Sequence, residues 1–205
     1  MSKDIDQTHH LGFATQAIHY AYSAKDEQGA LNPPMHLSST FTFETAKAGG
    51  DMFAGESHGH FYSRISNPTL DILEKRVACL EKAEAALSAA SGMGAISATL
   101  WTLLKADDEV LVDKTLYGCT YGFMHHGLAK FGVKITHVDM ADPNAVEHAI
   151  SGRPKVIYFE TPANPNMRLI DIEAVCKIAK ANHVITVVDN TYATPLLTQP
   201  IILGA

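Results

Sequence analysis

Residues 156–189, VIYFETPANPNMRLIDIEAVCKIAKANHVITVVD, contain the pattern that decides the fold. An apolar run at Val156–Glu160 comes first, a helical pattern at Ile172–Ala181 follows, and a second apolar run lies at Val184–Val188. Short apolar runs that are separated by a helical segment are typical of parallel strands joined by a crossover helix. The stretch therefore predicts one strand–helix–strand unit.

The same alternation extends toward the amino terminus. The predicted strands are Ala85–Ala89, Glu109–Val112 and Ile135–Asp139, and the predicted helices are Thr69–Lys82, Ala95–Leu104, Cys119–Lys130 and Pro143–Ile150. We expect Thr69 to cap the first helix, whose apolar stripe comprises Leu70, Leu73, Val77 and Leu80. Because right-handed crossovers place helices on both faces of a parallel sheet, the predicted fold is α/β, with a mostly parallel sheet covered on both sides. Ligands of such sheets bind beyond the carboxyl ends of the strands.

Residues 1–67 show little periodicity and are rich in Gly, Pro, Ser and His. They also contain the large apolar side chains Met35, Leu37, Phe41, Phe43, Phe53 and Phe61. Since ordering so long a segment must be offset by burial, we predict an extended amino-terminal arm over residues 1–67 that packs against a neighbouring subunit. Residues 68–205 then belong to the large α/β domain. Residues 200–205 are apolar where another strand would begin, so we expect the natural chain to continue into the rest of this domain.

The composition argues against several classes of partner. The formal net charge is −6 and the basic residues are scattered, so no basic surface for nucleic acid or an anionic membrane is expected. A small neutral or zwitterionic ligand fits better. The first ten residues lack the apolar core of a signal peptide, and no apolar run approaches the ~20 residues of a membrane-spanning helix. We therefore expect a cytoplasmic protein.

The cysteines and histidines do not follow a metal-binding pattern. Cys79, Cys119 and Cys176 are far apart and lack CxxC spacing, so neither a disulfide framework nor a zinc site is predicted. The histidine groups are His9-His10, His58 with His60, and His125-His126. Adjacent histidines on a helix point in different directions, and no acidic residue at helical spacing completes a set such as HExxH. We expect solvated or packed histidines and no metal.

Residues Ser91–Ala95, SGMGA, join a run of small residues to a predicted helix. Small side chains and backbone N–H groups at the positive end of a helix favour a phosphate, so the segment is a candidate anion cradle. A tight strand-to-helix turn is an equally good interpretation of this segment alone. The Walker pattern GxxxxGK is absent, and Ser97 stands where the dinucleotide fingerprint has Gly or Ala.

Polar residues near the ends of predicted strands are further candidates. Asp189 follows the last apolar run, where a carboxylate can keep a pyridine nitrogen protonated, although it can also simply cap the next turn. Tyr117 lies between a strand and a helix, where its ring can stack on a flat cofactor or only pack. Tyr62 and Arg64 combine a phenol with a guanidinium that suits phosphate oxygens, which is a weak indication by itself.

Taken together, these segments resemble one family. The order Tyr62-Ser63-Arg64, Asn67-Pro68-Thr69, Ser91-Gly92-Met93, Leu116–Thr120, Glu160–Pro165 and Val188–Thr191 is similar to that of the transsulfuration, or Cys/Met metabolism, family of pyridoxal-phosphate (PLP) enzymes. The resemblance covers nearly the whole chain. It implies the aspartate aminotransferase-like fold type I, pyridoxal 5′-phosphate as cofactor, and a homo-oligomer, expected to be a homotetramer of dimers that share active sites.

The resemblance also implies which residues bind the cofactor. Gly92 and Met93 would give backbone N–H groups to its phosphate, and Tyr62 and Arg64 would reach the same phosphate from an adjacent subunit. The other implied cofactor contacts are Asp189 with the pyridinium nitrogen, Asn164 near the phenolic oxygen of the ring, Tyr117 stacked on the ring, and Thr191.

Two residues have an implied catalytic role. Tyr117 would act as acid to the departing thiol, because a phenol of pKa about 10 is normally protonated. Cys119 would lie near the sulfur end of the substrate, although a small buried hydrophobic residue is an equally good interpretation. The resemblance places the lysine that binds the cofactor covalently shortly after Ala205, and the arginine that binds the substrate carboxylate in a carboxy-terminal domain. We therefore expect the 205 residues alone to be inactive.

Cysteine at position 119 indicates which reaction the resemblance implies. Many γ-lyases and γ-synthases of the family carry glycine there, whereas the members that cleave L-methionine carry cysteine. The implied reaction is α,γ-elimination, which converts L-methionine and water to methanethiol, ammonia and 2-oxobutanoate. The alternatives within the family are elimination from cystathionine and sulfhydrylation of a homoserine ester. Outside the family, a nicotinamide-dependent oxidoreductase and a non-catalytic assembly fragment stay open.

Overall fold

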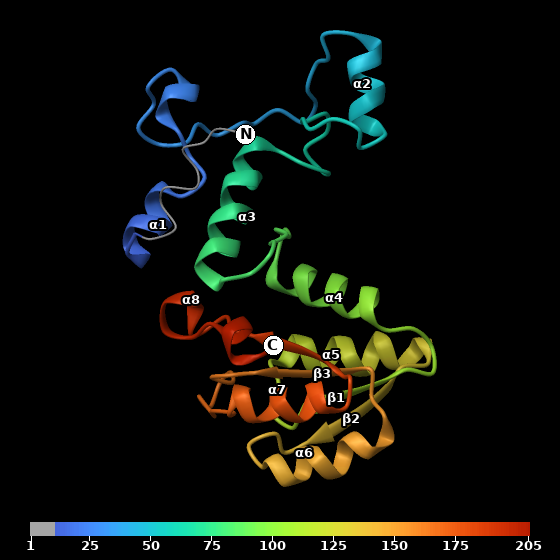
Figure 1. Ribbon diagram of the computed structural model, residues 1–205. Coiled ribbons are helices and arrows are strands. Elements are labelled where there is room, and N and C mark those ends of the chain that lie inside the picture. Colours follow the sequence, from blue (N-terminus) through green and yellow to red (C-terminus); the bar gives the residue numbers. More distant parts are fainter. Residues whose placement is uncertain (1–10) are drawn as a thin grey trace. The chain divides into compact units, whose positions relative to one another are not determined.

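The computed structural model describes residues 11–205 (Figure 1). The chain divides into two compact units, one up to Ser88 and one from Ala89 onward. The first unit includes the segment that we predicted as an arm and the helix that follows it, and the second contains the sheet. No helix within residues 11–205 is long and apolar enough to cross a membrane.

Four parallel strands form the sheet of the second unit. They are β1 (Glu109–Asp113), β2 (Lys134–Val138), β3 (Val156–Glu160) and β4 (Ile185–Asp189). Their order is β2-β1-β3-β4, so β1 and β3 are central. In the pairing of β3 with β4, Glu160 lies opposite Asp189. Because the strands are parallel, their carboxyl ends share one edge of the sheet.

Helices cover both faces of this sheet. They are α4 (Gly92–Leu103), α5 (Gly118–His126), α6 (Pro143–Ala149) and α7 (Ile172–Ala181). One buried cluster joins α4 and α5 to Val112 and Tyr158, and another joins α6 and α7 to Ile157 and Phe159. Neighbouring residues of a strand enter different clusters because successive side chains point to opposite faces. The predicted parallel sheet with helices on both faces is confirmed.

The remaining elements of the second unit are short. They are the 3-10 helices η3 (Leu128–Phe131), η4 (Ile150–Gly152) and η5 (Pro200–Leu203), and the helix α8 (Thr194–Leu197). The predicted helix Cys119–Lys130 is divided, because α5 ends at His126 and Gly127 separates it from η3. The predicted strand Val156–Glu160 and the predicted helix Ile172–Ala181 match β3 and α7 at both ends, and the other predicted helices and strands of this unit keep their type with shifted ends.

The predicted strand Ala85–Ala89 is wrong, since no regular structure forms there. The segment is mostly alanine, which has a low propensity for strands. Ser88, in this segment, bonds to a side chain of α3 instead of a neighbouring strand. Glu74 Oε1 accepts its backbone N–H at 2.8 Å and its hydroxyl at 2.7 Å.

The first unit contains helices and irregular segments. Its elements are α1 (Phe13–His19), η2 (Ala24–Glu27), α2 (Ala46–Phe53) and α3 (Pro68–Glu81). The cap of α3 is Asn67 rather than the predicted Thr69. Asn67 Oδ1 accepts the N–H of Thr69 at 2.9 Å, and Pro68 occupies the first helical position, where an N–H is not needed. Thr69 Oγ1 instead accepts the N–H of His36 at 2.9 Å.

A buried ion pair fixes the end of β1 and generates a stability prediction. Arg168 Nη1 donates to both carboxylate oxygens of Asp113, at 2.7 and 2.8 Å, and Asp113 is fully buried. Asp113→Ala removes one of the two carboxylate partners of the Arg168 guanidinium, which is only 18% exposed and also pairs with Asp139. It also removes the acceptor of the backbone N–H groups of Thr115 and Met140. We expect the free energy of unfolding to fall by about 3–5 kcal/mol, as measured by urea denaturation.

Lys134→Ala is the control for this measurement. Lys134 pairs with Glu109 but its side chain is 68% exposed, so its loss should lower the free energy of unfolding by less than about 1 kcal/mol. Equal effects of the two substitutions would contradict a stabilising role for the buried pair.

Candidate functional site

Asp189 is the last residue of β4, and neutral donors hold its carboxylate. Thr191 donates its backbone N–H and its hydroxyl to Oδ1, at 3.0 and 2.5 Å, and the Tyr158 hydroxyl donates to Oδ2 at 3.3 Å. Burial and the charge of Asp189 raise the pKa of Tyr158, so its hydroxyl stays protonated. These hydrogen bonds fix the direction of the Asp189 carboxylate.

Two cavities share Asp189 and Thr191 as lining residues. The smaller, of about 60 Å³, is lined by Tyr117, Glu160, Pro162, Asn164, Asp189, Thr191 and Tyr192. The larger, of about 240 Å³, lies between α4 and the end of β4, and its lining includes Gly92 and Tyr158. The fold thus brings Gly92, Tyr117, Asn164, Asp189 and Thr191 of the predicted site together at the carboxyl edge of the sheet.

The start of α4 borders the larger cavity. Ser91 caps this helix, since its Oγ accepts the N–H of Gly94 at 3.0 Å. The N–H groups of Gly92 and Met93 precede the first intrahelical hydrogen bond, so they can bind an anion. A Cβ added at Gly92 would meet no atom within 4 Å, which shows that the space there is open. The side chain of Met93 turns to α5, because the Thr120 hydroxyl lies 3.6 Å from its Sδ.

Tyr117 and Cys119 lie together at the start of α5. Their side chains interact and both are exposed. Cys119 is the main cause that raises the pKa of Tyr117, because a negative thiolate beside the phenol disfavours its ionisation, and desolvation and Tyr192 act in the same direction. A phenol with a raised pKa keeps its proton at neutral pH. Tyr117 is therefore suited to donate a proton.

Glu160, to which the sequence assigned no role, connects two loops of the site. It is buried, its Oε1 accepts the backbone N–H of Tyr117, and its Oε2 accepts that of Asn164 at 3.1 Å. Burial is the main cause that raises the pKa of Glu160, and the charges of Asp189 and Asp113 act in the same direction, against the two N–H donors.

Tyr62 and Arg64 belong to the first unit. Both are exposed, and Arg64 Cζ lies 5.2 Å from the centre of the Tyr62 ring, at a distance typical of a cation–π contact. Ser63, between them, donates its N–H to Ser39 O at 2.9 Å, which ties this segment to the preceding stretch of the chain. The two predicted phosphate ligands are thus neighbours within one unit.

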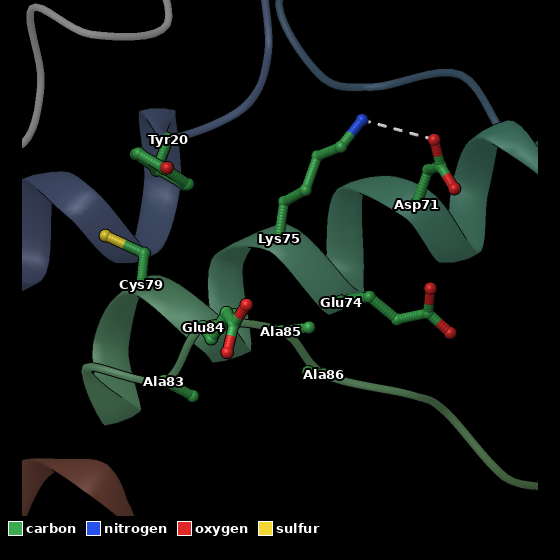
Figure 2. Close-up of a pocket in the computed structure, with 10 residues that line it drawn as sticks. Tyr20, Asp71, Glu74, Lys75, Cys79, Ala83, Glu84, Ala85 and Ala86 are labelled. Carbon is green, nitrogen blue, oxygen red and sulfur yellow. Dashed lines mark hydrogen bonds and ion pairs between the residues drawn. The ribbon is translucent and has the colours of Figure 1, made fainter. Parts of the chain in front are cut away.

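A separate cavity of about 310 Å³ lies in the first unit, along α3 (Figure 2). It contains none of the predicted site residues. Its lysine, Lys75, is paired with Asp71 at 3.1 Å, and the Glu74 carboxylate is bonded to Ser88. These charged groups already have partners, so this cavity is a weaker candidate site.

The histidines give a further comparison with the sequence. His9-His10 lie outside the described residues. His125 Nε2 lies 2.8 Å from Nε2 of His137 on β2, and the two rings are stacked, so His125 pairs across the fold and not with its neighbour in sequence. Among residues 11–205, no group of three or more His, Cys, Asp or Glu residues could hold a metal ion.

Sequence reasoning missed Glu160 and Tyr158 as parts of the site. Tyr158 is 1% exposed and lies within an apolar run, which indicated only a core position. Glu160 ends the same run, at the edge where ligands of parallel sheets bind, and that position was the available signal. Tyr158 contacts Asp189, and Glu160 contacts Tyr117 as well as Asn164, so each has a partner from a segment far away in the sequence.

The fold and its carboxyl edge define an α/β domain of the class that binds ligands beyond the carboxyl ends of its strands. Comparison with known proteins identifies the family. The model of the Cys/Met metabolism PLP-dependent enzymes matches residues 14–205, and the chain belongs to that family. An L-methionine γ-lyase from Pseudomonas putida is 59% identical over 194 residues, which are 95% of this chain and 49% of that protein. The chain spans about half the length of the curated relatives it matches.

Solved structures agree with this assignment. A protein assigned as O-acetylhomoserine (thiol)-lyase from Campylobacter jejuni, solved with pyridoxyl-lysine monophosphate, has a TM-score of 0.89 at 34% identity and is matched over 95% of this chain and 48% of its own. A cystathionine γ-lyase from Lactobacillus plantarum, complexed with L-serine, has a TM-score of 0.86 at 35% identity over 95% of this chain and 49% of its own. The fold is therefore PLP-dependent fold type I.

The effect of Cys119 on the pKa of Tyr117 generates a titration prediction. Because Cys119 raises the pKa of Tyr117, Cys119→Ala should lower it, so Tyr117 should ionise at lower pH in the variant. Tyrosinate absorbance, measured as a difference between variant and native protein, reports this shift. Cys119→Ala in a Tyr117→Phe background is the control, and there the substitution should not change the tyrosinate absorbance at any pH. A shift to higher pH would contradict the contact.

Proposed function

We propose that the full chain carrying these residues is a PLP-dependent methionine γ-lyase, which converts L-methionine and water to methanethiol, ammonia and 2-oxobutanoate. The observation that carries the proposal is the convergence of Asp189, Tyr117 and Gly92 on two cavities with shared walls at the carboxyl edge of the sheet. Cys119 and the 59% identity to an L-methionine γ-lyase support methionine as the substrate.

The residues of the site fit the chemistry of pyridoxal phosphate. Asp189 is a carboxylate with neutral donors around it, and such a group stabilises a protonated ring nitrogen. Gly92 and Met93 offer N–H groups at an open helix start, which suits a phosphate. Asn164 and Tyr117 line the smaller cavity with Asp189, as expected for residues near the phenolic oxygen and the face of the ring.

The cofactor, when bound, supplies an electron sink for proton removal from the substrate carbons. Asp189 holds the proton on the ring nitrogen, and Tyr158 and Thr191 keep its carboxylate in one direction. Tyr117 donates its phenolic proton to the sulfur of the departing thiol. Cys119 raises the pKa of the phenol, so Tyr117 carries its proton at neutral pH before the transfer.

We further propose a homotetramer of dimers in which residues 1–67 form an intersubunit arm, and Tyr62 and Arg64 complete the phosphate site of a neighbour. Large apolar side chains in the first unit support this arrangement: Leu37 is 92% exposed and Leu73, on the predicted stripe of α3, is 50% exposed. Leu31, Met35 and Phe53 of the same unit are exposed as well, and packing these side chains on another chain would remove apolar surface from water. The lysine and the substrate-binding arginine are expected outside the 205 residues, and the protein is expected in the cytoplasm.

Other reactions are distinguished by simple measurements. A cystathionine γ-lyase or an O-acetylhomoserine sulfhydrylase would prefer those substrates to methionine in competition assays. A nicotinamide-dependent oxidoreductase would be stabilised against heat by a nicotinamide dinucleotide and not by PLP. A non-catalytic fragment would form no pyridoxyl adduct on borohydride reduction.

Asp189 generates the first prediction for this function. In the full chain, Asp189→Asn should raise the dissociation constant of PLP about 10- to 100-fold, because a hydrogen bond to a charged group contributes about 1.5–3 kcal/mol. Equilibrium titration by absorbance measures the constant. Asp171→Asn is the matched control, since Asp171 only caps α7 and asparagine caps equally well. Equal constants for Asp189→Asn and native protein would contradict the role of Asp189.

The shared phosphate site generates a second prediction. Arg64→Ala and Asp189→Ala should each abolish the release of 2-oxobutanoate. When the two inactive chains are unfolded, mixed and refolded together, half of the dimers should contain one native site, so about a quarter of the native activity should return. A mixture of Asp189→Ala with Asn164→Ala is the control and should stay inactive, because both residues belong to one subunit's site. No recovery in the first mixture would contradict the proposal for Arg64.

A further inference from the structure

Glu160 occupies an unusual position for an acidic residue. It ends β3, a central strand whose five residues are all buried, and it is itself only 5% exposed. Two other carboxylates end the neighbouring strands, Asp113 on β1 and Asp189 on β4. A buried carboxyl next to like charges is costly unless specific donors compensate it.

The donors of Glu160 come from two different loops. Tyr117 follows β1 and donates its backbone N–H to Oε1, and Asn164 follows β3 and donates its backbone N–H to Oε2 at 3.1 Å. Both donors line the smaller cavity together with Asp189. One rigid side chain at the end of a central strand therefore sets the backbone position of two facing walls of that cavity.

The geometry argues against direct chemistry by Glu160. Both carboxylate oxygens are already bonded to N–H groups, and the side chain is almost fully buried. Asp189, opposite in the sheet register, is instead exposed enough to line both cavities. The contribution of Glu160 is therefore made through the residues that it holds.

We propose that Glu160 is a positioning residue, whose carboxylate fixes the backbone of Tyr117 and Asn164 so that the phenol and the amide face the cavity beside Asp189. This inference rests on the proposed function, because it assigns to Glu160 the preorganisation of the cofactor site. Preorganised groups bind more tightly because little ordering remains to be done on binding.

The loop that contains Asn164 is also held by contacts that do not involve Glu160. A change at Glu160 can therefore alter the position of Asn164 without unfolding the loop. Ala163 donates its N–H to Arg168 O at 2.9 Å, and Arg168 is held by the buried carboxylate of Asp113. The Thr161 hydroxyl accepts the N–H of Ile170 at 3.0 Å. These contacts do not involve Glu160, so the loop should stay folded when only the glutamate is changed.

The test uses Glu160→Gln in the full chain. Glutamine has the same shape but only one carbonyl oxygen, so it can accept one of the two N–H groups and turns an NH2 toward the other. Glu109→Gln is the matched control, because Glu109 begins β1 at the opposite edge of the sheet and bonds to Thr136 and Lys134.

We expect Glu160→Gln to raise the dissociation constant of PLP about tenfold or more and to change the visible circular dichroism of the bound cofactor, whereas Glu109→Gln does neither. If the native full chain does not bind PLP, the proposed function is wrong. Native binding with an unchanged Glu160→Gln variant would overturn only the role of Glu160.

A double-mutant cycle separates positioning from a general structural effect. Because Glu160 acts through both Tyr117 and Asn164, the loss of affinity caused by Glu160→Gln should be smaller in a Tyr117→Ala background than in native protein, since only the part that acts through Asn164 remains. The same factor in both backgrounds would overturn the proposal.

Hydrogen exchange in the native full chain gives a test that needs no variant, should Glu160→Gln fail to fold. The amide of Tyr117 belongs to an exposed residue but is bonded to a buried carboxylate. We expect it to exchange more than about tenfold slower than an unprotected peptide amide. Exchange at the unprotected rate would overturn the proposal.

Discussion

Parallel pairing brings three carboxylates to one edge of the sheet, and the structure around that edge is arranged to accommodate them. Asp113, Glu160 and Asp189 end three adjacent strands, β1, β3 and β4. Each has a different set of partners. Arg168 neutralises Asp113, backbone N–H groups satisfy Glu160, and two hydroxyls with one N–H hold Asp189. Only the first of these sets carries a positive charge, so the edge keeps a negative field suited to a cationic ligand atom.

The same arrangement connects the site to the stability of the fold. Arg168 and Glu160 both fix the loop after β3, one through Asp113 and the other through the N–H of Asn164. Tyr117, on the loop after β1, is held by the same glutamate. The walls of the smaller cavity therefore depend on buried charged groups, Asp113 and Glu160, at the ends of the central strands.

The sequence predicted the architecture because apolar runs and helical stripes alternate clearly between residues 92 and 189. It failed at Ala85–Ala89, where small residues imitate a buried strand but offer little side-chain packing, and at the cap of α3, where Asn67 before Pro68 is a stronger signal than Thr69. Candidate residues such as Asp189 and Gly92 could be found because they stand at the end of a strand and the start of a helix. Glu160 and Tyr158 could not, since their roles depend on contacts with Tyr117 and Asp189, which come from distant parts of the sequence.

We propose that Asp189 keeps a bound pyridine nitrogen protonated at this edge. The ¹⁵N chemical shift of PLP, labelled at its ring nitrogen and bound to the full chain at neutral pH, reports that protonation directly. We expect the shift of a protonated pyridinium in the native protein and that of a neutral pyridine in Asp189→Ala. A neutral ring nitrogen in the native protein, or an unchanged shift in the variant, would contradict it.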